Sequence, residues 1–391
     1  MPRAEEPVTT KKSPLHDEHV ALGAHLTPFG GWDMPLRYTS DLAEHRAVRE
    51  AAGLFDLSHM GGINVTGPEA AAFLDHALVG NFSALRPMRA RYTMICADDG
   101  GVLDDLIVYH NGTDEYFAVP NAANADAVLV AMLERAAGFD VAVRDISASL
   151  ALIAVQGPRA EEILREVLTE DPEISGGTAL DDLRYYACMG LRFGEEGVLV
   201  ARTGYTGEDG FEIWVDTPHA VALWRALLAA GEPYGLVPAG LAARDSLRLE
   251  AGMPLYGNEL DTTTTPYDAG AGRIVKLDKS HDDGTPVDFV GREALAARSE
   301  AEPERVLVGL RGTGRRPARA GYAVVRTTDD GGVGEPVGTV TSGVPSPTLG
   351  HPVAMAYVRP DVAAEGTELA VDVRGRAEPF VVTAMPFYRR G

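Results

Sequence analysis

Residues 63–78 read INVTGPEAAAFLDHAL, and residues 153–168 read IAVQGPRAEEILREVL. Each segment starts with a short apolar run typical of a β-strand, turns at Gly-Pro and continues with the apolar spacing of an amphipathic helix. The two turn glycines, Gly67 and Gly157, lie 157 − 67 = 90 positions apart. Proline after the glycine suits the first turn of a helix, because its φ is fixed and it needs no amide hydrogen. The repetition predicts two related strand–turn–helix units, although Gly-Pro before a helix also arises by chance.

The sequence around this repeat predicts a body of mixed α and β structure. A helix is expected over residues 218–230 with Thr217 as its N-cap, and a second over residues 239–251, ended by Gly252. The strands expected between these segments are residues 105–109, 115–119, 197–201 and 212–215. We therefore expect an α+β body over residues 15–300, built from two interleaved subdomains.

The sequence changes character at about residue 304. Residues 300–304 (EAEPE) are the expected linker, and turns such as Asp329-Asp330-Gly331-Gly332 separate short β-rich runs after it. This spacing predicts a small antiparallel barrel or sandwich over residues 305–388. The expected strands are residues 305–310, 321–326, 337–341, 353–358, 368–373 and 380–384.

Composition excludes several classes of partner. The 391 residues include 57 acidic and 35 basic side chains, which gives a formal charge of −22. Such a charge argues against non-specific binding of nucleic acid and against docking on anionic lipid, both of which need basic surfaces. No stretch approaches the eighteen or so apolar residues of a membrane span. We expect neither nucleic acid nor membrane among the partners.

Cysteine usage and the first residues indicate a cytoplasmic protein. Cys96 and Cys188 are too few for a disulfide framework or a four-thiolate zinc site. Residues 1–14 (MPRAEEPVTTKKSP) lack the apolar core of an export signal. Both cysteines are therefore expected to be reduced thiols.

The common catalytic motifs are missing. Gly270-Ala271-Gly272 has no third glycine and no preceding strand, so it does not predict a dinucleotide site. The sequence has no P-loop, no HExxH metal motif and no GxSxG nucleophile turn. We expect no metal and no nicotinamide, and chemistry that relies on carboxylates, positioning and an external cofactor.

Four segments carry candidate site residues. One of them, FGGWDMPL (29–36), places the Trp32 indole beside a flexible turn, where core packing is the default interpretation. Asp104 and Asp105 follow a glycine turn into an apolar strand, where alternation places them on opposite faces, so one can face a cavity. A carboxylate near apolar walls has a raised pKa and can exchange a proton with an amine. An Asp-rich hairpin turn is the alternative interpretation.

The other two segments are a glycine-rich turn and a helix. Glu212 ends the stretch TGYTGEDGFE (203–212), where it can face inward and bind a heterocycle's amino and ring N–H groups, or lie in an exposed acidic loop. Arg244 and Arg248 share one helix face and can hold a flat ligand or form ion pairs with neighbouring carboxylates.

Together and in this order, these segments resemble the aminomethyltransferase (T-protein) family of the glycine cleavage system. The resemblance covers nearly the whole chain. The blocks that carry it are FGGWDMPL (29–36), FDLSHM (55–60), GGVLDDLIV (100–108), VQGP (155–158), TGYTGEDGFE (203–212), GLAARDSLRLEAGMPLYG (240–257), FVGREAL (289–295) and VTSGVPSPTLG (340–350).

The resemblance implies a fold and a reaction. The fold is a three-domain cloverleaf around a central folate channel, with a C-terminal β-barrel. The reaction moves the one-carbon unit of an aminomethyl group, carried on the lipoyl arm of the H-protein, to tetrahydrofolate. Ammonia leaves and 5,10-methylenetetrahydrofolate forms. Tetrahydrofolate is thus the expected co-substrate, without metal, nicotinamide or flavin.

The resemblance also implies roles for individual residues. Asp104 matches the family's catalytic aspartate, and Glu212 matches its pterin-binding glutamate. Arg244 matches a functionally important arginine. The remaining matches to ligand-contacting positions are Tyr92, Asn121, Tyr205 and, more weakly, Tyr388.

Two positions depart from the family pattern, and three other activities compete. Arg273 stands where many members carry tryptophan, and Pro120 interrupts a strand end that is often Val or Ser. A tetrahydrofolate-dependent demethylase of the same fold remains an alternative. A non-enzymatic folate-binding iron–sulfur assembly factor is disfavoured because the turn TGYTGED (203–209) carries no cysteine. A dimethylglycine or sarcosine oxidase would need an attached flavin domain, for which 391 residues leave no room.

Overall fold

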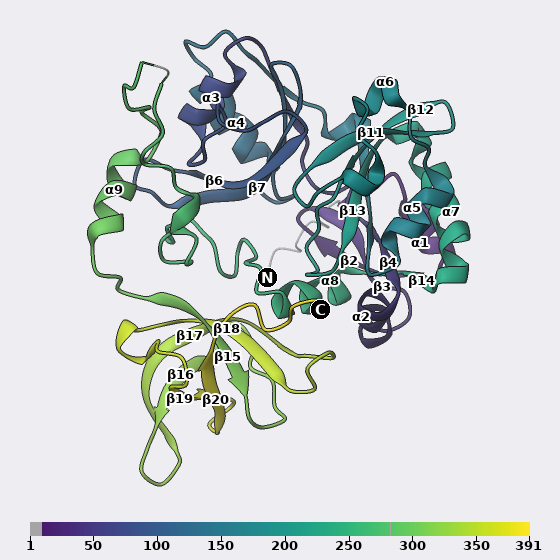
Figure 1. The fold of residues 1–391 in the computed structure, drawn as a ribbon. Helices are drawn as coiled ribbons and strands as arrows, with labels where there is room; N and C mark the ends of the chain where they lie inside the picture. Colours follow the sequence, from purple (N-terminus) through teal and green to yellow (C-terminus); the bar gives the residue numbers. More distant parts are fainter. Residues whose placement is uncertain (1–9, 282) are drawn as a thin grey trace, which may run out of the picture.

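The computed structural model describes residues 10–281 and 283–391. Two sheets with their helices form the upper part of the molecule, and a barrel lies below them (Figure 1). The expectation of no export signal concerns mainly residues 1–9, which lie outside the described residues. Within the described residues, no helix has the length and apolar character needed to cross a membrane.

The first sheet has the strand order β6-β7-β8-β5-β9. Helices α3 (Ala70–Ala77) and α4 (Ala125–Arg135) cover one of its faces through a core that includes Phe73, Leu74 and Met132. The strands are β5 (Ile63–Thr66), β6 (Arg89–Cys96), β7 (Val102–Gly112), β8 (Glu115–Val119) and β9 (Ala142–Asp145).

The second sheet has the order β11-β12-β13-β10-β4-β14. Helices α5 (Ala160–Val167) and α7 (Ala220–Gly231) pack against it, with Trp224 fully buried between them and the sheet. The strands are β4 (Ala52–Asp56), β10 (Leu150–Gln156), β11 (Cys188–Phe193), β12 (Glu196–Ala201), β13 (Gly210–Asp216) and β14 (Leu236–Pro238).

The predicted repeat is confirmed in its geometry. The turn glycines Gly67 and Gly157 have φ of 133° and 136°, values that side chains rarely allow. A Cβ at either position would lie 2.5 Å from a backbone oxygen, that of Asp140 or Ala51. The helices start at Ala70 and Ala160, two residues later than the proline, because the first turn closes with an i to i−3 hydrogen bond.

The two repeats exchange a strand. β4 precedes β5 in the chain but pairs antiparallel with β10 of the second sheet. β9 precedes β10 but pairs antiparallel with β5 of the first sheet. The two sheets also pack face to face, and Phe117 meets Trp214 edge-on with ring centroids 4.7 Å apart. Each half of the body therefore completes the other.

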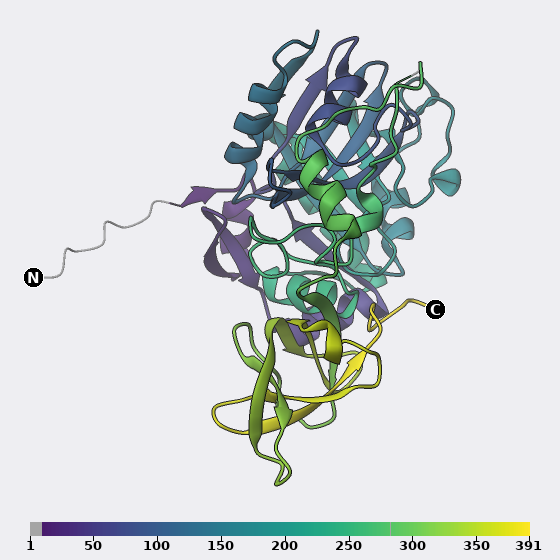
Figure 2. The same cartoon turned by 90° about the vertical axis from the view of Figure 1, so that its left-hand side faces the viewer.

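The predicted barrel is confirmed, and it is closed. Its six strands follow the order β15-β18-β17-β16-β19-β20, with antiparallel pairing throughout. Figure 2 shows it below the two sheets, joined through α9 (Arg292–Glu300). The strands are β15 (Val306–Gly312), β16 (Ala323–Thr327), β17 (Val333–Pro345), β18 (Pro352–Val358), β19 (Glu368–Asp372) and β20 (Ala377–Thr383).

The N-terminal segment and α8 (Leu241–Glu250) lie between these parts. Leu249 of α8 packs against Val353 and Met355 of the barrel. The N-terminal elements are β1 (Lys11–Lys12), α1 (His16–Ala21), β2 (His25–Phe29), β3 (Trp32–Arg37) and α2 (Asp41–Glu50). The remaining short helices are α6 (Pro172–Ser175) and the 3₁₀ turns Ser147–Ser149, Leu180–Asp182, Thr217–His219, Glu232–Tyr234, Gly272–Ile274 and Pro360–Val362.

The predicted N-cap of the helix near residue 218 is wrong. Thr217 opens a 3₁₀ turn, and α7 begins at Ala220 with His219 at its N-cap position. The Thr217 hydroxyl instead donates to the carbonyl of Ala148, 3.2 Å away. The hydroxyl therefore ties the helix start to the segment before β10, a contact that local sequence does not reveal.

Candidate active site

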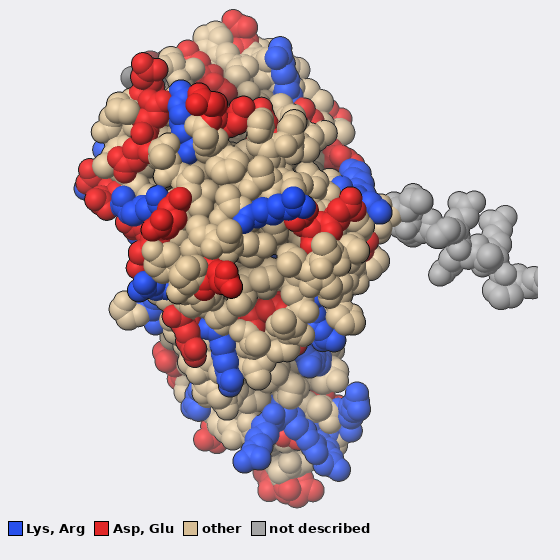
Figure 3. Space-filling view, turned by 90° about the vertical axis from the view of Figure 1, so that its right-hand side faces the viewer, with Lys and Arg blue, Asp and Glu red and all other residues tan. Residues whose placement is uncertain are grey.

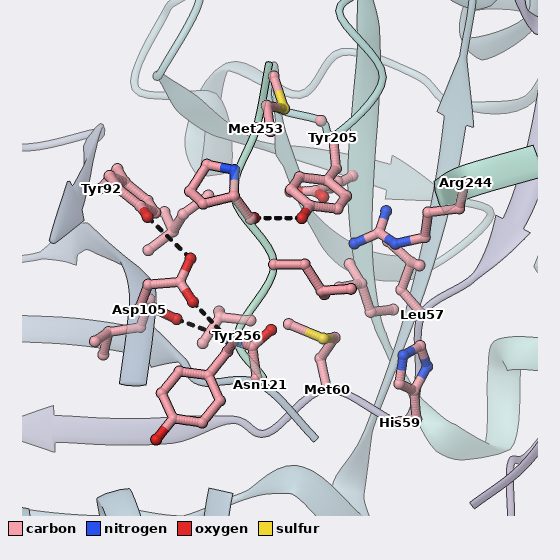
Figure 4. A pocket seen from close by; sticks show the side chains of 18 of the residues that line it. Leu57, His59, Met60, Tyr92, Asp105, Asn121, Tyr205, Arg244, Met253 and Tyr256 are labelled. Atoms are coloured by element: carbon pink, nitrogen blue, oxygen red, sulfur yellow. Dashed lines mark hydrogen bonds between the residues drawn. The ribbon is translucent and has the colours of Figure 1, made fainter. Parts of the chain in front are cut away.

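A cavity of about 280 Å³ lies between the two sheets and the segment that follows α8. Its walls come from β6, β7 and β8 on one side and from β13 and α8 on the other, as Figure 4 shows in part. The lining residues are Phe29, Leu57, His59, Met60, Tyr92, Asp105, Leu106, Ile107, Tyr109, Val119, Asn121, Leu152, Tyr186, Gly204, Tyr205, Glu212, Arg244 and the segment 252–256.

Asp105 forms the acidic end of the cavity. Its Oδ2 accepts a hydrogen bond from the Tyr92 hydroxyl at 2.9 Å, and its Oδ1 accepts one from Nδ2 of Asn121 at 2.9 Å (Figure 4). Burial raises the pKa of Asp105 to about 6, against the effect of these two donors. The structure thus brings Tyr92 and Asn121, both expected from the resemblance, together around one carboxyl group that can change charge near neutral pH.

Asp104 lies on the opposite face of β7, as strand alternation requires. It is fully buried, does not line the cavity, and accepts hydrogen bonds from the backbone N–H and Nδ2 of Asn121 and from Nδ2 of Asn124. Burial and the neighbouring Asp105 raise the pKa of Asp104 to about 7. Asp105 therefore contacts the cavity, whereas Asp104 lies behind it and holds Asn121 in place through hydrogen bonds.

The glycine turn before β7 explains why the aspartates lie here. Gly100 has φ of 85°, and a Cβ on Gly101 would lie 2.2 Å from the carbonyl oxygen of Thr262. The turn therefore packs directly against the segment after α8, and this contact sets where β7 enters the sheet. The interpretation of this segment as a simple Asp-rich turn is wrong, because both carboxylates are at least partly buried.

Glu212 supplies a second acceptor on the cavity wall. It lies in β13 and is only 8% exposed. Its Oε2 accepts hydrogen bonds from the hydroxyls of Thr203 and Tyr109. The alternative of an exposed acidic loop is therefore wrong for Glu212, although Asp209 of the same stretch does pair with Arg202 and Arg390.

Arg244 is the cation of the cavity. Its guanidinium stacks on the ring of Tyr205, 4.6 Å from the centroid, and the Tyr205 hydroxyl donates to the carbonyl of Pro254. Burial lowers the pKa of Arg244, and the nearby Tyr205 and Glu212 act in the opposite direction. No ion pair within residues 10–281 and 283–391 involves Arg244, which leaves its charge available to a ligand.

Arg248, one turn further along α8, has a structural role. Its Nη1 lies 2.9 Å from Oε2 of Glu259, and its Nη2 donates to the Ser342 hydroxyl at 2.7 Å. These contacts connect α8 to β17 of the barrel. Each of the two alternatives predicted for this pair therefore holds for one arginine. Arg244 faces the cavity, and Arg248 forms ion pairs.

The weakly predicted site residue Tyr388 and the two departures from the family pattern, Arg273 and Pro120, lie away from the cavity wall. Tyr388 stacks under Arg49, 4.0 Å from its guanidinium carbon, and donates its backbone N–H to the carbonyl of Glu250. Arg273 is exposed in the turn Gly272–Ile274. Pro120 directly follows β8, and its carbonyl accepts the N–H of Gly61 at 3.0 Å.

Sequence reasoning missed His59, Met60 and Phe29 as cavity residues. His59 and Met60 belong to the block FDLSHM (55–60), which covers the end of β4 and the loop after it, and both line the cavity. Phe29, and not Trp32, reaches the cavity from the FGGW turn. The sequence did show the two blocks that contain these residues. Their contact with the cavity could not be predicted, because it depends on how the N-terminal segment packs.

Comparison with known proteins bears on this architecture. Residues 15–279 match the family model of the GCVT N-terminal domain, and residues 305–389 match that of the glycine cleavage T-protein C-terminal barrel domain. The aminomethyltransferase of Streptomyces coelicolor is 56% identical over 97% of this chain and 98% of its own length. That of Moorella thermoacetica is 46% identical over 97% of this chain and 98% of its own length.

A solved structure agrees with these matches. The crystal structure of glycine cleavage system aminomethyltransferase T from Bartonella henselae superposes with a TM-score of 0.85 and 36% identity, over 97% of this chain and 98% of that one. The fold and cavity therefore define a two-sheet transferase body with an appended barrel. The chain belongs to the glycine cleavage T-protein family. The prediction of an aminomethyltransferase enzyme is confirmed.

Proposed function

We propose that the enzyme transfers the one-carbon unit of an aminomethyl-lipoyl arm, carried by a lipoylated H-protein, to tetrahydrofolate. The observation that carries this proposal is the cavity, in which two carboxylates and one uncompensated arginine surround an apolar centre. A reduced pteridine has the same character, since a flat ring carries both N–H donors and a carbonyl acceptor. The volume is near the lower end of small-molecule sites, roughly 300 Å³, so the glutamate tail would extend outside.

The proposed reaction balances without an oxidant. The carbon–sulfur and carbon–nitrogen bonds of the S-aminomethyl group break, and new bonds form from that carbon to N5 and N10 of tetrahydrofolate. Of the two hydrogens released from N5 and N10, one leaves with ammonia and the other is transferred to the lipoyl sulfur, which becomes a thiol. The products are ammonia, 5,10-methylenetetrahydrofolate and a dihydrolipoyl arm.

The site residues have distinct proposed roles. Glu212 accepts hydrogen bonds from the amino and ring N–H groups of the pterin, and Tyr92, Tyr205 and Arg244 surround the ligand. Asp105 faces the reacting nitrogens and takes up a proton, which its raised pKa favours near neutral pH.

The proposed role of Asp104 follows from its hydrogen bonds. The sequence predicts Asp104 as the catalytic aspartate, whereas its contacts favour a positioning role through Asn121. Tyr388 is proposed to support the loop 203–209 and not to touch the ligand, because it packs beside Gly207.

The direct test combines purified enzyme, aminomethylated lipoyl carrier protein and tetrahydrofolate. We expect equal amounts of ammonia and 5,10-methylenetetrahydrofolate, with no product when the carrier lacks its lipoyl group. Folate binding with turnover only of methylated sulfonium or amine donors would instead identify a demethylase. Folate binding without any turnover would point to a folate-dependent assembly factor.

The remaining parts of the proposal concern cofactors and location. We propose that the reaction uses no metal, nicotinamide or flavin, which a metal-free and flavin-free preparation with full turnover would test. A cytoplasmic location is also proposed, and the free thiols of the buried Cys96 and Cys188 support it.

A further inference from the structure

His59 lines the cavity without a role in the contacts assigned above. It lies in the loop between β4 and β5, is only 3% exposed and packs edge-on against Phe29, with ring centroids 5.5 Å apart. Figure 4 shows its ring on the same side of the cavity as the Arg244 guanidinium. A polar ring buried at this place needs either a protein partner or a ligand.

The two ring nitrogens differ in their surroundings. Nδ1 of His59 is enclosed and has no hydrogen-bond partner among the described residues. Burial lowers the pKa of His59 to about 4, with the Arg244 charge adding to this effect and the Asp56 charge opposing it. The ring is therefore neutral at physiological pH and carries one hydrogen, on one of the two nitrogens.

The enclosed position of Nδ1 decides which nitrogen carries the hydrogen. An enclosed N–H without an acceptor is rarer and more costly in proteins than an unfilled lone pair. The neutral tautomer thus places its hydrogen on Nε2, which is not among the enclosed atoms without a partner, and the His59 side chain lines the cavity. His59 then presents a donor, next to the Arg244 cation and within electrostatic reach of it.

The neighbouring groups identify the acceptor that this donor fits. Glu212, Arg244 and His59 line the same cavity, and the Arg244 charge influences the pKa of His59 as the Glu212 charge influences that of Arg244. A pterin places its 4-oxo oxygen next to the ring N–H that a carboxylate would hold. We propose that Nε2 of His59 donates a hydrogen bond to the 4-oxo oxygen of the bound pterin and selects it over a 4-amino ring. This inference rests on the proposed function.

The test measures binding of two ligands, tetrahydrofolate and its 4-amino counterpart, to the intact enzyme by titration calorimetry. In wild type, tetrahydrofolate binds more tightly, because a 4-amino group offers no acceptor to a donor. His59→Leu weakens tetrahydrofolate binding by roughly tenfold or more and leaves 4-amino binding nearly unchanged. His59→Gln retains the preference, since its amide nitrogen can occupy the Nε2 position. His25→Leu, at an exposed site on β2, is the matched control.

A second measurement uses the wild-type enzyme and so does not depend on whether a variant folds. Nitrogen-15 NMR of the wild-type enzyme at neutral pH should show His59 with its hydrogen on Nε2. A hydrogen on Nδ1, or equal loss of affinity for both ligands in His59→Leu, overturns the inference and leaves the proposed function intact. Failure of wild type to bind tetrahydrofolate overturns both.

Discussion

At the residue scale, the two adjacent aspartates of β7 have opposite surroundings and should differ in what they do. Asp105→Asn keeps the shape and one acceptor but removes the proton-accepting group, so we expect kcat to fall by roughly 10²–10⁴-fold. The Kd for tetrahydrofolate should change little. Asp104→Asn, the matched control on the other face of the strand, should lower kcat less. Steady-state assays of both variants decide the assignment, and a larger loss in Asp104→Asn would return the catalytic role to Asp104.

The raised pKa of Asp105 makes a second prediction, on stability. Because the folded-state pKa is about 6 and the ordinary value is 3.8, the folded state binds the proton more tightly. The stabilisation from this group is complete below about pH 4 and is lost as the pH rises through about 6. At pH 8 the ionised carboxylate therefore destabilises the fold.

Asp105→Asn removes that charge, so its free energy of unfolding should exceed that of wild type at pH 8 by roughly 1–3 kcal/mol. Urea denaturation at pH 8 and pH 4 measures the difference, which should shrink at the lower pH. An Asp105→Asn protein that is less stable than wild type at pH 8 would contradict the proposed cost of this carboxylate.

The sequence predicted most of the residues around the cavity, but not which of the two aspartates of β7 faces it. Alternation along β7 predicted that Asp104 and Asp105 face opposite ways, and the resemblance located Glu212, Tyr205 and Arg244. Which face of β7 meets the cavity depends on the contact of Gly101 with the segment after α8, more than 150 positions away. Local sequence patterns do not predict a contact between residues so far apart in the chain.

At the scale of elements, the C-terminal end of α3 depends on a distant lysine. Lys279 is 2% exposed, and its Nζ donates to the carbonyls of Asp75, Leu78 and Gly80. Lys279→Met would leave these three acceptors buried without a donor. We expect a loss of roughly 2–4 kcal/mol in the free energy of unfolding, measured from the urea midpoint with an unchanged m-value.

Lys276 is the matched control for this change. Its Nζ donates to the carbonyl of Arg273 at the surface, so Lys276→Met should change the free energy of unfolding by less than about 0.5 kcal/mol. If both variants have the same urea midpoint as wild type, Lys279 does not cap α3 in solution.

Elements were easier to predict than their pairing. The six barrel strands and the two repeat helices follow from apolar spacing and turn residues, which are local properties. The pairing of β4 with β10 joins residues about 100 positions apart, so the strand exchange had no local signal. The same holds for Thr217, whose hydroxyl bonds to Ala148 and not to the helix it precedes.

At the scale of the whole molecule, Glu250 at the end of α8 connects the body to the barrel. Its carboxylate accepts hydrogen bonds from Ser346 and Thr348 of the barrel and from Arg49 of α2, and it lies 3.2 Å from Nε2 of His45. Burial alone would raise the pKa of Glu250, but these partners hold it at about 2. The resulting stabilisation is present above about pH 4.5 and is lost as the pH falls through about 2.

Glu250→Gln should therefore loosen the barrel from the body at neutral pH. We expect faster cleavage by a protease in the linker 300–304, at a temperature where the rest of the chain stays intact. Glu335→Gln, which removes an exposed ion pair with Arg359, is the control and should leave the cleavage rate unchanged. Equal rates for wild type and Glu250→Gln would show that the other contacts, such as those of Arg248 with Ser342 and of Leu249 with Val353 and Met355, hold the interface without this carboxylate.

On the face shown in Figure 3, the acidic side chains behind the net charge of −22 are not concentrated at one site. On the face in Figure 3, acidic and basic side chains are interspersed over the sheets, and basic side chains gather at the lower end, over the barrel. Charges beyond about 8 Å are screened at physiological salt, so local side chains and not the net charge decide how an anionic ligand such as tetrahydrofolate is attracted.

The exchange of β4 and β9 limits how early each sheet can form while the chain is being synthesised on the ribosome. The first sheet lacks its edge strand until residue 145 has been synthesised, and β4 stays without its antiparallel partner until β10 emerges at residues 150–156. Neither half can reach its native hydrogen bonding alone. A cut between residues 112 and 115, in the hairpin that joins β7 to β8, would leave two fragments that recover the native sheets only when mixed.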